Sequence, residues 1–378
     1  MSPREEGNMS ELVIDGVRIA DDTNAFVIAE LGHNHAGVAE MLGISHVEGA
    51  KRLIQAAHQA GASAVKFQKR DNRMLYTKAF YDAPYQSENA YGTTYGAHRE
   101  ALEFDWAEYC ELRDYAVSLP ITLFATPFDC SSVDFLEQLG VPCYKVASGS
   151  LTNVNLIQYI AQMGKPILLS TGGGTLEDIT RAIDVIQAVW CHLKPCYARC
   201  EVMALLQCTA VYPCPPALLN LQVIAHFREI YTCVIGLSSH HTAIWDCLAA
   251  YVLGARIFEK HFTLKTSARG TDHAFSLVPR QLATLVEDLH ALRLALGDGV
   301  KRPYPQEQAA LEKMGSGLYA ARTIPVHHIL ESVDVVVKSP GGPIPAWKLP
   351  EVIGRIIPME LAEDDPIWSS SRAGGVDE

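Results

Sequence analysis

Short apolar runs alternate with longer amphipathic stretches through most of the chain. Eight of these runs have the length and composition of buried β-strands, at residues 26–31, 64–68, 123–128, 143–147, 167–170, 203–208, 234–237 and 256–258. The stretches between them carry apolar residues at helical spacing, as at 49–60, 105–118, 131–139, 151–163, 176–189 and 243–254. Strands that alternate with helices indicate a parallel sheet, and eight such units predict a closed (β/α)8 TIM barrel.

The segments on either side of the barrel have a different pattern. Residues 12–20 alternate apolar and polar side chains around Asp15-Gly16, which predicts a two-stranded flap. We assign residues 12–300 to the barrel, 301–315 to a linker with a short helix at 307–314, and 316–368 to a small, mostly β domain. The two ends, 1–11 and 369–378, are expected to be loose tails.

Two segments interrupt the alternation of strands and helices. Residues 36–48 have the pattern of a loop after the first strand. Residues 71–99 form a longer segment, rich in tyrosine, that ends in His98 and Arg99. A loop of this length is usually functional or disordered, and the tyrosines argue against disorder. We therefore expect residues 71–99 to fold over the barrel mouth or into an oligomer interface.

Polar side chains gather at the C-terminal ends of nearly all the apolar runs. They are Glu30, Lys66, Gln68, Thr126, Lys145, Ser148, Ser170, Ser238, His240, Glu259 and His261. Any one of them alone is as well explained by a helix cap or a solvated loop. The C-terminal mouth carries the chemistry in such barrels, so agreement among nearly all the runs predicts an active site there.

Composition narrows the class of protein. Hydrophobic residues make up 48% of the 378-residue chain, charged residues 20%, and the net charge is −12, with no run of Lys or Arg. These values fit an enzyme with a sizeable core and argue against binding to nucleic acid or an anionic membrane. The first residues are polar, no apolar run is long enough to span a membrane, and the ten cysteines are scattered, so we expect a cytoplasmic protein. Cys191, Cys196 and Cys200 cluster without a Cys-x2-Cys pair, which makes structural zinc improbable.

Two histidines and two lysines carry the predicted chemistry. His240 follows the seventh run and His261 the eighth, so parallel neighbouring strands would bring both imidazoles to one edge, where they suit a divalent metal. Lys66 and Lys145, with nearby serines, suit a phosphate, and a glycine-rich turn at 171–175 offers backbone N–H groups. A metal-assisted condensation or a phosphate hydrolysis would fit. No Gly-x-Gly-x-x-Gly follows any strand, which argues against a nicotinamide dehydrogenase.

Eight motifs in order resemble the sialic acid (N-acetylneuraminate) synthase family over about residues 12–300. They lie at residues 28–37, 64–68, 125–129, 144–149, 169–172, 208–213, 236–240 and 259–262. Residues 316–367 resemble the C-terminal antifreeze-like (SAF) domain of that family. The resemblance implies a TIM barrel enzyme that joins phosphoenolpyruvate to the open-chain aldehyde of a sugar. The products would be a nonulosonic (sialic-acid-like) 2-keto acid and phosphate.

The resemblance also implies roles for residues. His240 and His261 resemble ligands of Mn²⁺ or Mg²⁺, and Glu30 resembles the acidic residue near the reacting carbons. Phosphoenolpyruvate would be bound by Lys66, Thr126, Lys145, Ser148, Ser170 and Ser238, and the sugar would meet Gln68, Tyr212 and Asp272. The family pattern further implies a domain-swapped homodimer, in which the small domain of one copy caps the barrel of the other.

The sequence departs from the family pattern where the acceptor sugar is expected. An acidic residue of the family is Ser150 here, and its cation at the start of the small domain is Ser316 or Gly317. Ser239-His240-His241 replaces Asp-His-Thr, and Ala210 replaces an Asn. We therefore expect a modified sugar as acceptor. Two other functions remain open: a non-catalytic barrel that binds a phosphorylated metabolite as a dimeric scaffold, and an aldolase or phosphatase with the same pocket.

Overall fold

The computed structural model describes residues 10–193 and 202–368 and divides the chain into two compact units. The first unit is Met1–Gly297 and the second is Asp298–Glu378. The outer parts of both predicted tails, and Cys196 and Cys200 of the cysteine cluster, lie outside the described residues. No helix in the described part of the chain is long and apolar enough to cross a membrane.

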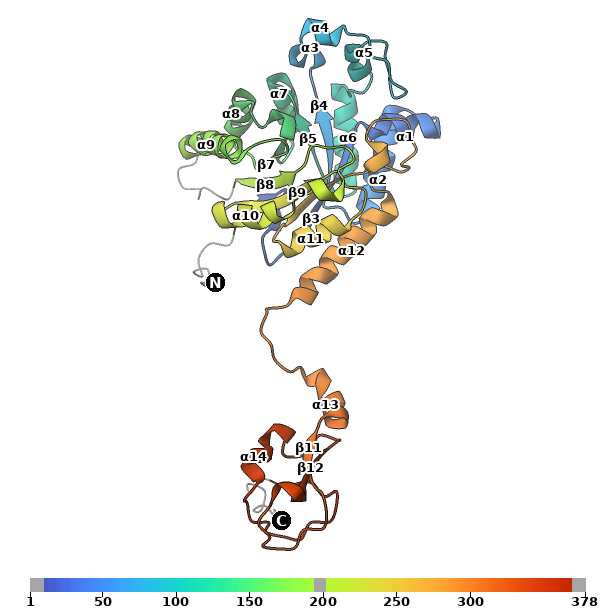
Figure 1. The fold of residues 1–378 in the computed structure, drawn as a ribbon. Coiled ribbons are helices and arrows are strands. Elements are labelled where there is room, and N and C mark those ends of the chain that lie inside the picture. Colours follow the sequence, from blue (N-terminus) through green and yellow to red (C-terminus); the bar gives the residue numbers. More distant parts are fainter. Residues whose placement is uncertain (1–9, 194–201, 369–378) are drawn as a thin grey trace. The chain divides into compact units, whose positions relative to one another are not determined.

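The first unit is built on a closed barrel of eight parallel strands (Figure 1). The strands are β3 (Phe26–Gly32), β4 (Ala64–Lys69), β5 (Thr122–Pro127), β6 (Tyr144–Val146), β7 (Ile167–Ser170), β8 (Met203–Cys208), β9 (Val234–Ser239) and β10 (Ile257–His261). They follow one another around the barrel in chain order, and β10 closes it by pairing with both β9 and β3. The predicted (β/α)8 fold is confirmed.

Helices surround the barrel, and local sequence fixes where several of them begin. They are α1 (Asn34–Leu42), α2 (His46–Gln59), α6 (Trp106–Ser118), α7 (Cys130–Leu139), α8 (Val154–Gln162), α9 (Leu176–Leu193), α10 (Gln222–Ile230), α11 (Trp245–Val252) and α12 (Pro279–Leu296). Ser45 and Asp129 cap α2 and α7 by accepting from backbone N–H groups. Asp105 and Glu108 form a capping box at the start of α6.

The predicted flap is present as the hairpin of β1 (Leu12–Ile14) and β2 (Val17–Ile19). Asp15 and Gly16 both have positive φ angles, 51° and 75°, as a tight two-residue turn requires. Thr122 at the start of β5 donates a hydrogen bond to the Asp15 carboxylate, 2.9 Å away. The hairpin therefore lies at the N-terminal end of the barrel, opposite the catalytic mouth.

Two of the expected elements are corrected by the structure. Residues 36–48 are not a loop, because α1 spans Asn34–Leu42 and α2 begins at His46. Six of the nine residues of α1 are buried, so packing favours the helix even though its sequence, with a glycine and small residues, lacks a clear amphipathic pattern. The eighth strand extends to His261 instead of ending at residue 258, so Glu259 and Lys260 belong to it.

The second unit has a core of its own and little regular structure. It contains α13 (Gln308–Met314), α14 (Leu349–Val352) and a two-stranded sheet of β11 (Gly317–Ala320) and β12 (Val335–Lys338). Isolated β-bridges, such as Ile324 with Leu361, join its turns. The residues of its core are Leu318, Ala320, Ile324, Leu330, Val335, Ile344, Val352, Ile357, Leu361 and Ile367.

Candidate active site

One cavity of about 400 Å³ opens at the C-terminal mouth of the barrel. All twelve site residues expected from the sequence line it: Glu30, Lys66, Gln68, Thr126, Lys145, Ser148, Ser170, Tyr212, Ser238, His240, His261 and Asp272. Strand register explains part of this convergence, since His261 pairs with Glu30 and Glu30 pairs with Lys66 on three neighbouring strands. Paired residues of a parallel sheet point to the same face, here the inside of the barrel.

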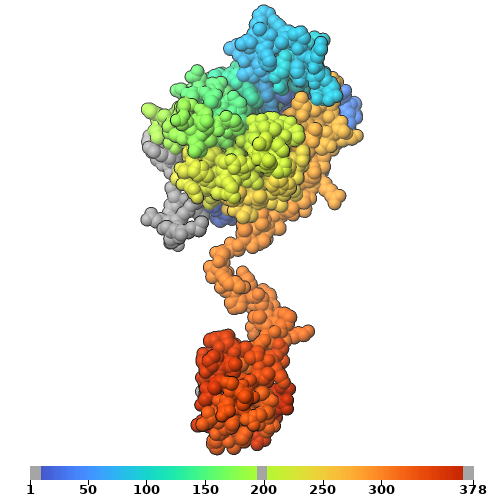
Figure 2. All heavy atoms as spheres, in the orientation of Figure 1, coloured from blue at the N-terminus to red at the C-terminus, as the bar shows by residue number. Residues whose placement is uncertain are grey.

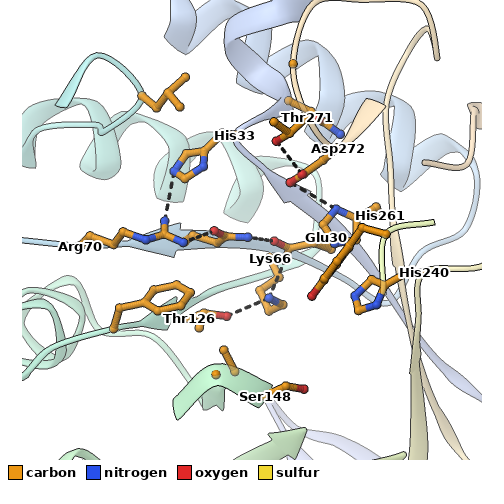
Figure 3. Close-up of a pocket in the computed structure, with 18 of the residues that line it drawn as sticks. Glu30, His33, Lys66, Arg70, Thr126, Ser148, His240, His261, Thr271 and Asp272 are labelled. Atoms are coloured by element: carbon orange, nitrogen blue, oxygen red, sulfur yellow. Dashed lines mark hydrogen bonds and ion pairs between the residues drawn. The ribbon is translucent and has the colours of Figure 1, made fainter. Parts of the chain in front are cut away.

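Two lysines, Lys66 and Lys145, and two carboxylates, Glu30 and Glu259, form a buried array that lines the cavity. Figure 3 shows Glu30 and Lys66 of this array side by side. Lys66 Nζ lies 2.6 Å from Glu30 Oε2 and donates to Thr126 Oγ1 at 2.8 Å. The Glu259 carboxylate lies 3.8 Å from the ammonium groups of both Lys66 and Lys145. Two cations and two anions therefore balance one another at the base of the site.

The array shifts the pKa values of its own members. Burial alone would lower the pKa of Lys66, but Glu259 and Glu30 outweigh burial and raise it. Burial would raise the pKa of Glu259, but Lys145 and Lys66 hold it at about 2. Burial and the charge of Lys66 lower the pKa of Lys145, which is thus the lysine whose charge is less fully compensated. An incoming anion would relieve that imbalance.

The two histidines lie side by side at the edge of the array, with ring centroids 5.5 Å apart. His240 Nδ1 lies 2.9 Å from the carbonyl oxygen of Thr209, which can only accept, so the proton is on Nδ1 and Nε2 keeps its lone pair. Burial and His261 lower the pKa of His240 to about 3. His261 Nδ1 is buried, has no hydrogen bond among the described residues, and lies 3.6 Å from Asp272 Oδ2.

The tyrosine-rich segment forms one wall of the cavity. It folds into three short helices, α3 (Asn72–Leu75), α4 (Lys78–Tyr81) and α5 (Tyr95–Glu100), and Figure 2 shows it in light blue as a compact mass on the barrel unit. Its residues that line the cavity are Tyr85, Asn89, Tyr91, His98 and Arg99. Arg269 contacts the tyrosine-rich segment twice: it donates a hydrogen bond to the backbone oxygen of Glu88, and its guanidinium lies over the Tyr91 ring. The segment therefore lies at the barrel mouth, which is one of the two places expected for it.

The comparisons with known proteins agree with this geometry. A family model described as the NeuB family matches residues 53–301. The chain belongs to the NeuB family. It is 34% identical over 349 residues to N-acetylneuraminate-9-phosphate synthase of Mus musculus, which covers 92% of both chains. It is also 34% identical over 343 residues to N,N'-diacetyllegionaminic acid synthase of Campylobacter jejuni, covering 90% of this chain and 98% of that relative.

A solved structure supports the same assignment. The N-acetylneuraminic acid synthetase from Leptospira borgpetersenii, determined in complex with citrate, matches with a TM-score of 0.67 and 29% identity. The match covers 81% of this chain and 97% of that one. The predicted resemblance and the predicted enzyme class, a synthase of the sialic acid type, are confirmed at the level of the NeuB family.

The donor set at the histidines fits a divalent metal in this NeuB-family chain. His240 presents an unprotonated Nε2, and His261 has a buried nitrogen without a partner among the described residues. Imidazole nitrogens are donors that Mn²⁺ accepts, and the Asp272 carboxylate lies close to His261. No group of three or more His, Cys, Asp or Glu side chains in the described residues is placed to hold a metal alone. Substrate or water oxygens would therefore have to complete the coordination.

Several residues of the site had no predicted role. Glu259 is the most important: it is expected at the mouth only as one of the polar residues that follow the apolar runs, and alternation along β10 places it in the cavity, because Ile257, Glu259 and His261 share one face of the strand. Lys260 points to the other face, where its ammonium lies 3.5 Å from the Asp246 carboxylate. Arg70 and His33 also line the cavity, but they lie just beyond the strand ends, where no periodicity places a side chain.

Other residues that the sequence analysis singled out do not line the cavity. Residues 171–175 are not among its described lining residues, and the Gly172 N–H instead donates to Ser148 Oγ at 3.0 Å. His241 does not line the cavity, and its Nδ1 lies 3.0 Å from the Cys214 carbonyl oxygen. It therefore cannot substitute for a lost sugar contact. Ser150 is 6% exposed and is not a lining residue, whereas Ala210 is.

Proposed function

We propose that this NeuB-family enzyme condenses phosphoenolpyruvate with the open-chain aldehyde of an amino sugar, giving a nonulosonic 2-keto acid and phosphate. The observation that carries the proposal is the buried array of Lys66, Lys145, Glu30 and Glu259 beside the paired His240 and His261. A scaffold has no need for this costly arrangement of buried charge. The names of the relatives, synthases of N-acetylneuraminate 9-phosphate and of diacetyllegionaminate, support the same product class.

The lysines are proposed to bind phosphoenolpyruvate. Lys66 and Lys145 offer two ammonium groups. The Thr126 hydroxyl accepts a hydrogen bond from Lys66, and the Ser238 hydroxyl donates one to Glu259. The Ser170 hydroxyl is buried and has no partner among the described residues, which leaves it ready for a ligand oxygen. Charge-assisted bonds of this kind suit a phosphate and a carboxylate on one small molecule.

The carboxylates are proposed to act on the reacting carbons. In the reaction, C3 of phosphoenolpyruvate forms a bond with the aldehyde carbon, whose oxygen takes a proton. Water then adds to C2, and the bond from C2 to the phosphate oxygen breaks, leaving the 2-keto group. Positive charge develops at C2 before water adds. Glu30, held by Lys66 and by a 2.7 Å hydrogen bond from Gln68 Nε2, is fixed beside that position and stabilises the charge.

A divalent metal, Mn²⁺ or Mg²⁺, is proposed at His240 and His261. When bound, it supplies a Lewis acid for a carbonyl oxygen of the acceptor. The chain's own residues orient that acceptor. Tyr212 packs on the His240 ring, with centroids 3.9 Å apart, and Asp272 lies next to His261, so both border the space in front of the histidines.

The assembly proposed is a homodimer in which the second unit, as an antifreeze-like (SAF) domain, covers the partner's barrel. Large apolar side chains stand exposed on that unit, with Val333 69%, Trp347 72% and Ile356 61% exposed. Exposed apolar groups of this size favour burial in an interface. Light scattering of the full chain tests the proposal: it predicts a dimer that Trp347→Glu dissociates, and a monomeric native chain would contradict it.

The function itself is tested by phosphate release. Purified full-length protein with Mn²⁺ should release phosphate only when both phosphoenolpyruvate and an aldose are present. Release from phosphoenolpyruvate alone would indicate a phosphatase. Binding of phosphoenolpyruvate without turnover across a panel of amino sugars and their phosphates would indicate a scaffold.

A further inference from the structure

The cavity holds a second group of cations apart from the two lysines. Arg70, 7% exposed, and Arg99 both line it, beyond Lys66. In Figure 3, Arg70 lies beside His33 on one side of the site, His240 and His261 lie on the other, and Glu30 and Lys66 lie between them. Arg99 reaches the cavity from α5, in the segment that forms its wall.

These two arginines are poorly compensated by carboxylates. Arg99 donates to the Tyr95 hydroxyl at 3.0 and 3.1 Å, and no carboxylate of the described residues lies within 4.0 Å of its guanidinium. Arg70 lies 4.0 Å from Glu103, but that carboxylate is already bound by Lys69 at 3.0 Å. Lys69 and Arg70 therefore share one carboxylate, and Arg99 has none within that distance among the described residues.

The arginines also repel each other. Burial, and next the charge of Arg99, lower the pKa of Arg70. Burial and then both arginines lower the pKa of His33, so that this ring is neutral and cannot add to the charge. Like charges held together with only partial counter-charge cost free energy, and that cost is recovered when an anion binds between them.

Their remaining contacts keep the guanidinium groups in fixed positions. Arg70 lies over the Phe128 ring, 3.8 Å from its centroid, and donates to Gln68 Oε1 at 2.6 Å. Arg99 lies over the ring of Tyr95, whose hydroxyl also accepts from it. A guanidinium held by stacking keeps its other N–H groups for a ligand, and its planar fork matches a phosphate.

We propose that Arg99 and Arg70 form a second anion subsite, which binds a phosphate monoester on the acceptor sugar at the end remote from its aldehyde. The inference rests on the proposed function, since the aldehyde is placed at His240 and His261 on the other side of the cavity. It gives the tyrosine-rich segment a chemical role, because that segment carries Arg99 over the mouth. The acceptor class it assigns is an N-acylhexosamine 6-phosphate.

The test compares two acceptors that differ only in the phosphate. With full-length enzyme, Mn²⁺ and saturating phosphoenolpyruvate, N-acetylmannosamine 6-phosphate is expected to give a kcat/KM at least roughly tenfold above that of N-acetylmannosamine. Arg99→Met should reduce this preference roughly 10- to 100-fold, mainly through KM for the phosphorylated sugar. Arg99→Lys should retain part of it.

Arg73→Met is the matched control, because Arg73 lies in the same segment over the Tyr81 ring and does not line the cavity. It should leave the preference unchanged. Three results would each overturn the phosphate subsite while the proposed function stands. The first is an equal kcat/KM for the two sugars, and the second is an undiminished preference for the phosphorylated sugar in Arg99→Met. The third is a kcat/KM for N-acetylmannosaminuronate above that for N-acetylmannosamine 6-phosphate. Failure of every sugar to release phosphate would instead overturn the proposed function.

Discussion

Glu30 and Lys66 form an ion pair of 2.6 Å at the centre of the barrel mouth, where both side chains are almost fully buried. Neighbouring strands hold the two residues in register. Breaking such a pair on one side leaves an uncompensated buried charge, so neither partner can be removed without consequence. In the proposed mechanism, the pair links phosphoenolpyruvate binding at Lys66 to the stabilisation of charge at the reacting carbons by Glu30.

Removing either Lys66 or Lys145 should weaken the binding of phosphoenolpyruvate more than the binding of the sugar. Lys66→Met and Lys145→Met each delete a charge-assisted contact to a buried anion, a loss of about 1.5–3 kcal/mol, or roughly 10- to 150-fold in binding. Steady-state KM values for both substrates measure the effect. Lys165→Met is the control, because Lys165 is a half-exposed partner of Glu137 outside the cavity. Equal rises in both KM values would contradict the assignment.

His240→Ala should abolish metal binding and turnover while leaving the fold intact, because the side chain lies at the mouth and not in the apolar core. Mn²⁺ binding, followed by electron paramagnetic resonance on the chelated and reloaded protein, gives a readout independent of activity. His241→Ala is the neighbouring control and should keep Mn²⁺ binding, since that ring faces Cys214. Native Mn²⁺ affinity in His240→Ala would rule out the predicted ligand.

Lys260 should matter for stability. Its ammonium lies 3.5 Å from Asp246 and donates to the Ala243 carbonyl oxygen at 3.1 Å, and both charged residues are at most 1% exposed. Lys260→Met leaves Asp246 buried without its partner, which costs about 3–5 kcal/mol in the free energy of unfolding.

Urea unfolding measures this cost. Lys78→Met removes an exposed partner of Asp82 and should cost under about 1 kcal/mol. The double variant Lys260→Met/Asp246→Leu should recover part of the loss. An unfolding curve for Lys260→Met that matches the native one would show that the pair does not stabilise the barrel.

The tyrosine-rich wall should loosen in acid through His98. Its Nδ1 accepts from the Tyr91 N–H at 3.1 Å, and burial, with the charges of Arg99 and Arg269, lowers its pKa to about 4 from an ordinary 6.5. A depressed pKa stabilises the closed wall above pH 6.5, and that contribution is lost progressively as the pH falls from 6.5 to 4.

Hydrogen exchange, corrected for intrinsic rates, should show protection of residues 84–99 falling roughly tenfold between pH 7 and pH 5. In His98→Asn, which keeps an acceptor near the Nδ1 position but does not titrate in this range, protection should be lower and independent of pH. Equal pH dependence in both proteins would exclude His98 as the cause.

The barrel and the inner site could be predicted because strand periodicity is a local signal. Apolar runs located the eight strands, and polar residues at their ends converge once the sheet closes. Glu259 is expected at the mouth from its position after the eighth apolar run, but its role in the charged array could not be predicted, because a run of charged residues does not look like the end of a buried strand. Glu259 and Lys260 can be buried because each has a charged partner distant in sequence. Lys66 and Lys145 are the partners of Glu259, and Asp246 is the partner of Lys260.

The outer site could not be predicted in the same way. Arg99 reaches the cavity only because residues 71–99 fold back onto the barrel, and contacts such as the one from Arg269 to Glu88 span about half of the chain. The sequence pattern at residues 36–48 predicts a loop where α1 ends and α2 begins, for a related reason. The burial of α1 against the rest of the barrel outweighs its own weak amphipathic pattern.

The most direct test of the central claim follows the new carbon–carbon bond. Enzyme supplied with [3-¹³C]phosphoenolpyruvate, Mn²⁺ and the preferred amino sugar phosphate is analysed by ¹³C NMR and mass spectrometry. We expect the label as a methylene carbon bonded to the former aldehyde carbon of a 2-keto acid, with one phosphate released per molecule formed. Label recovered only as pyruvate, with the sugar unchanged, would contradict the account.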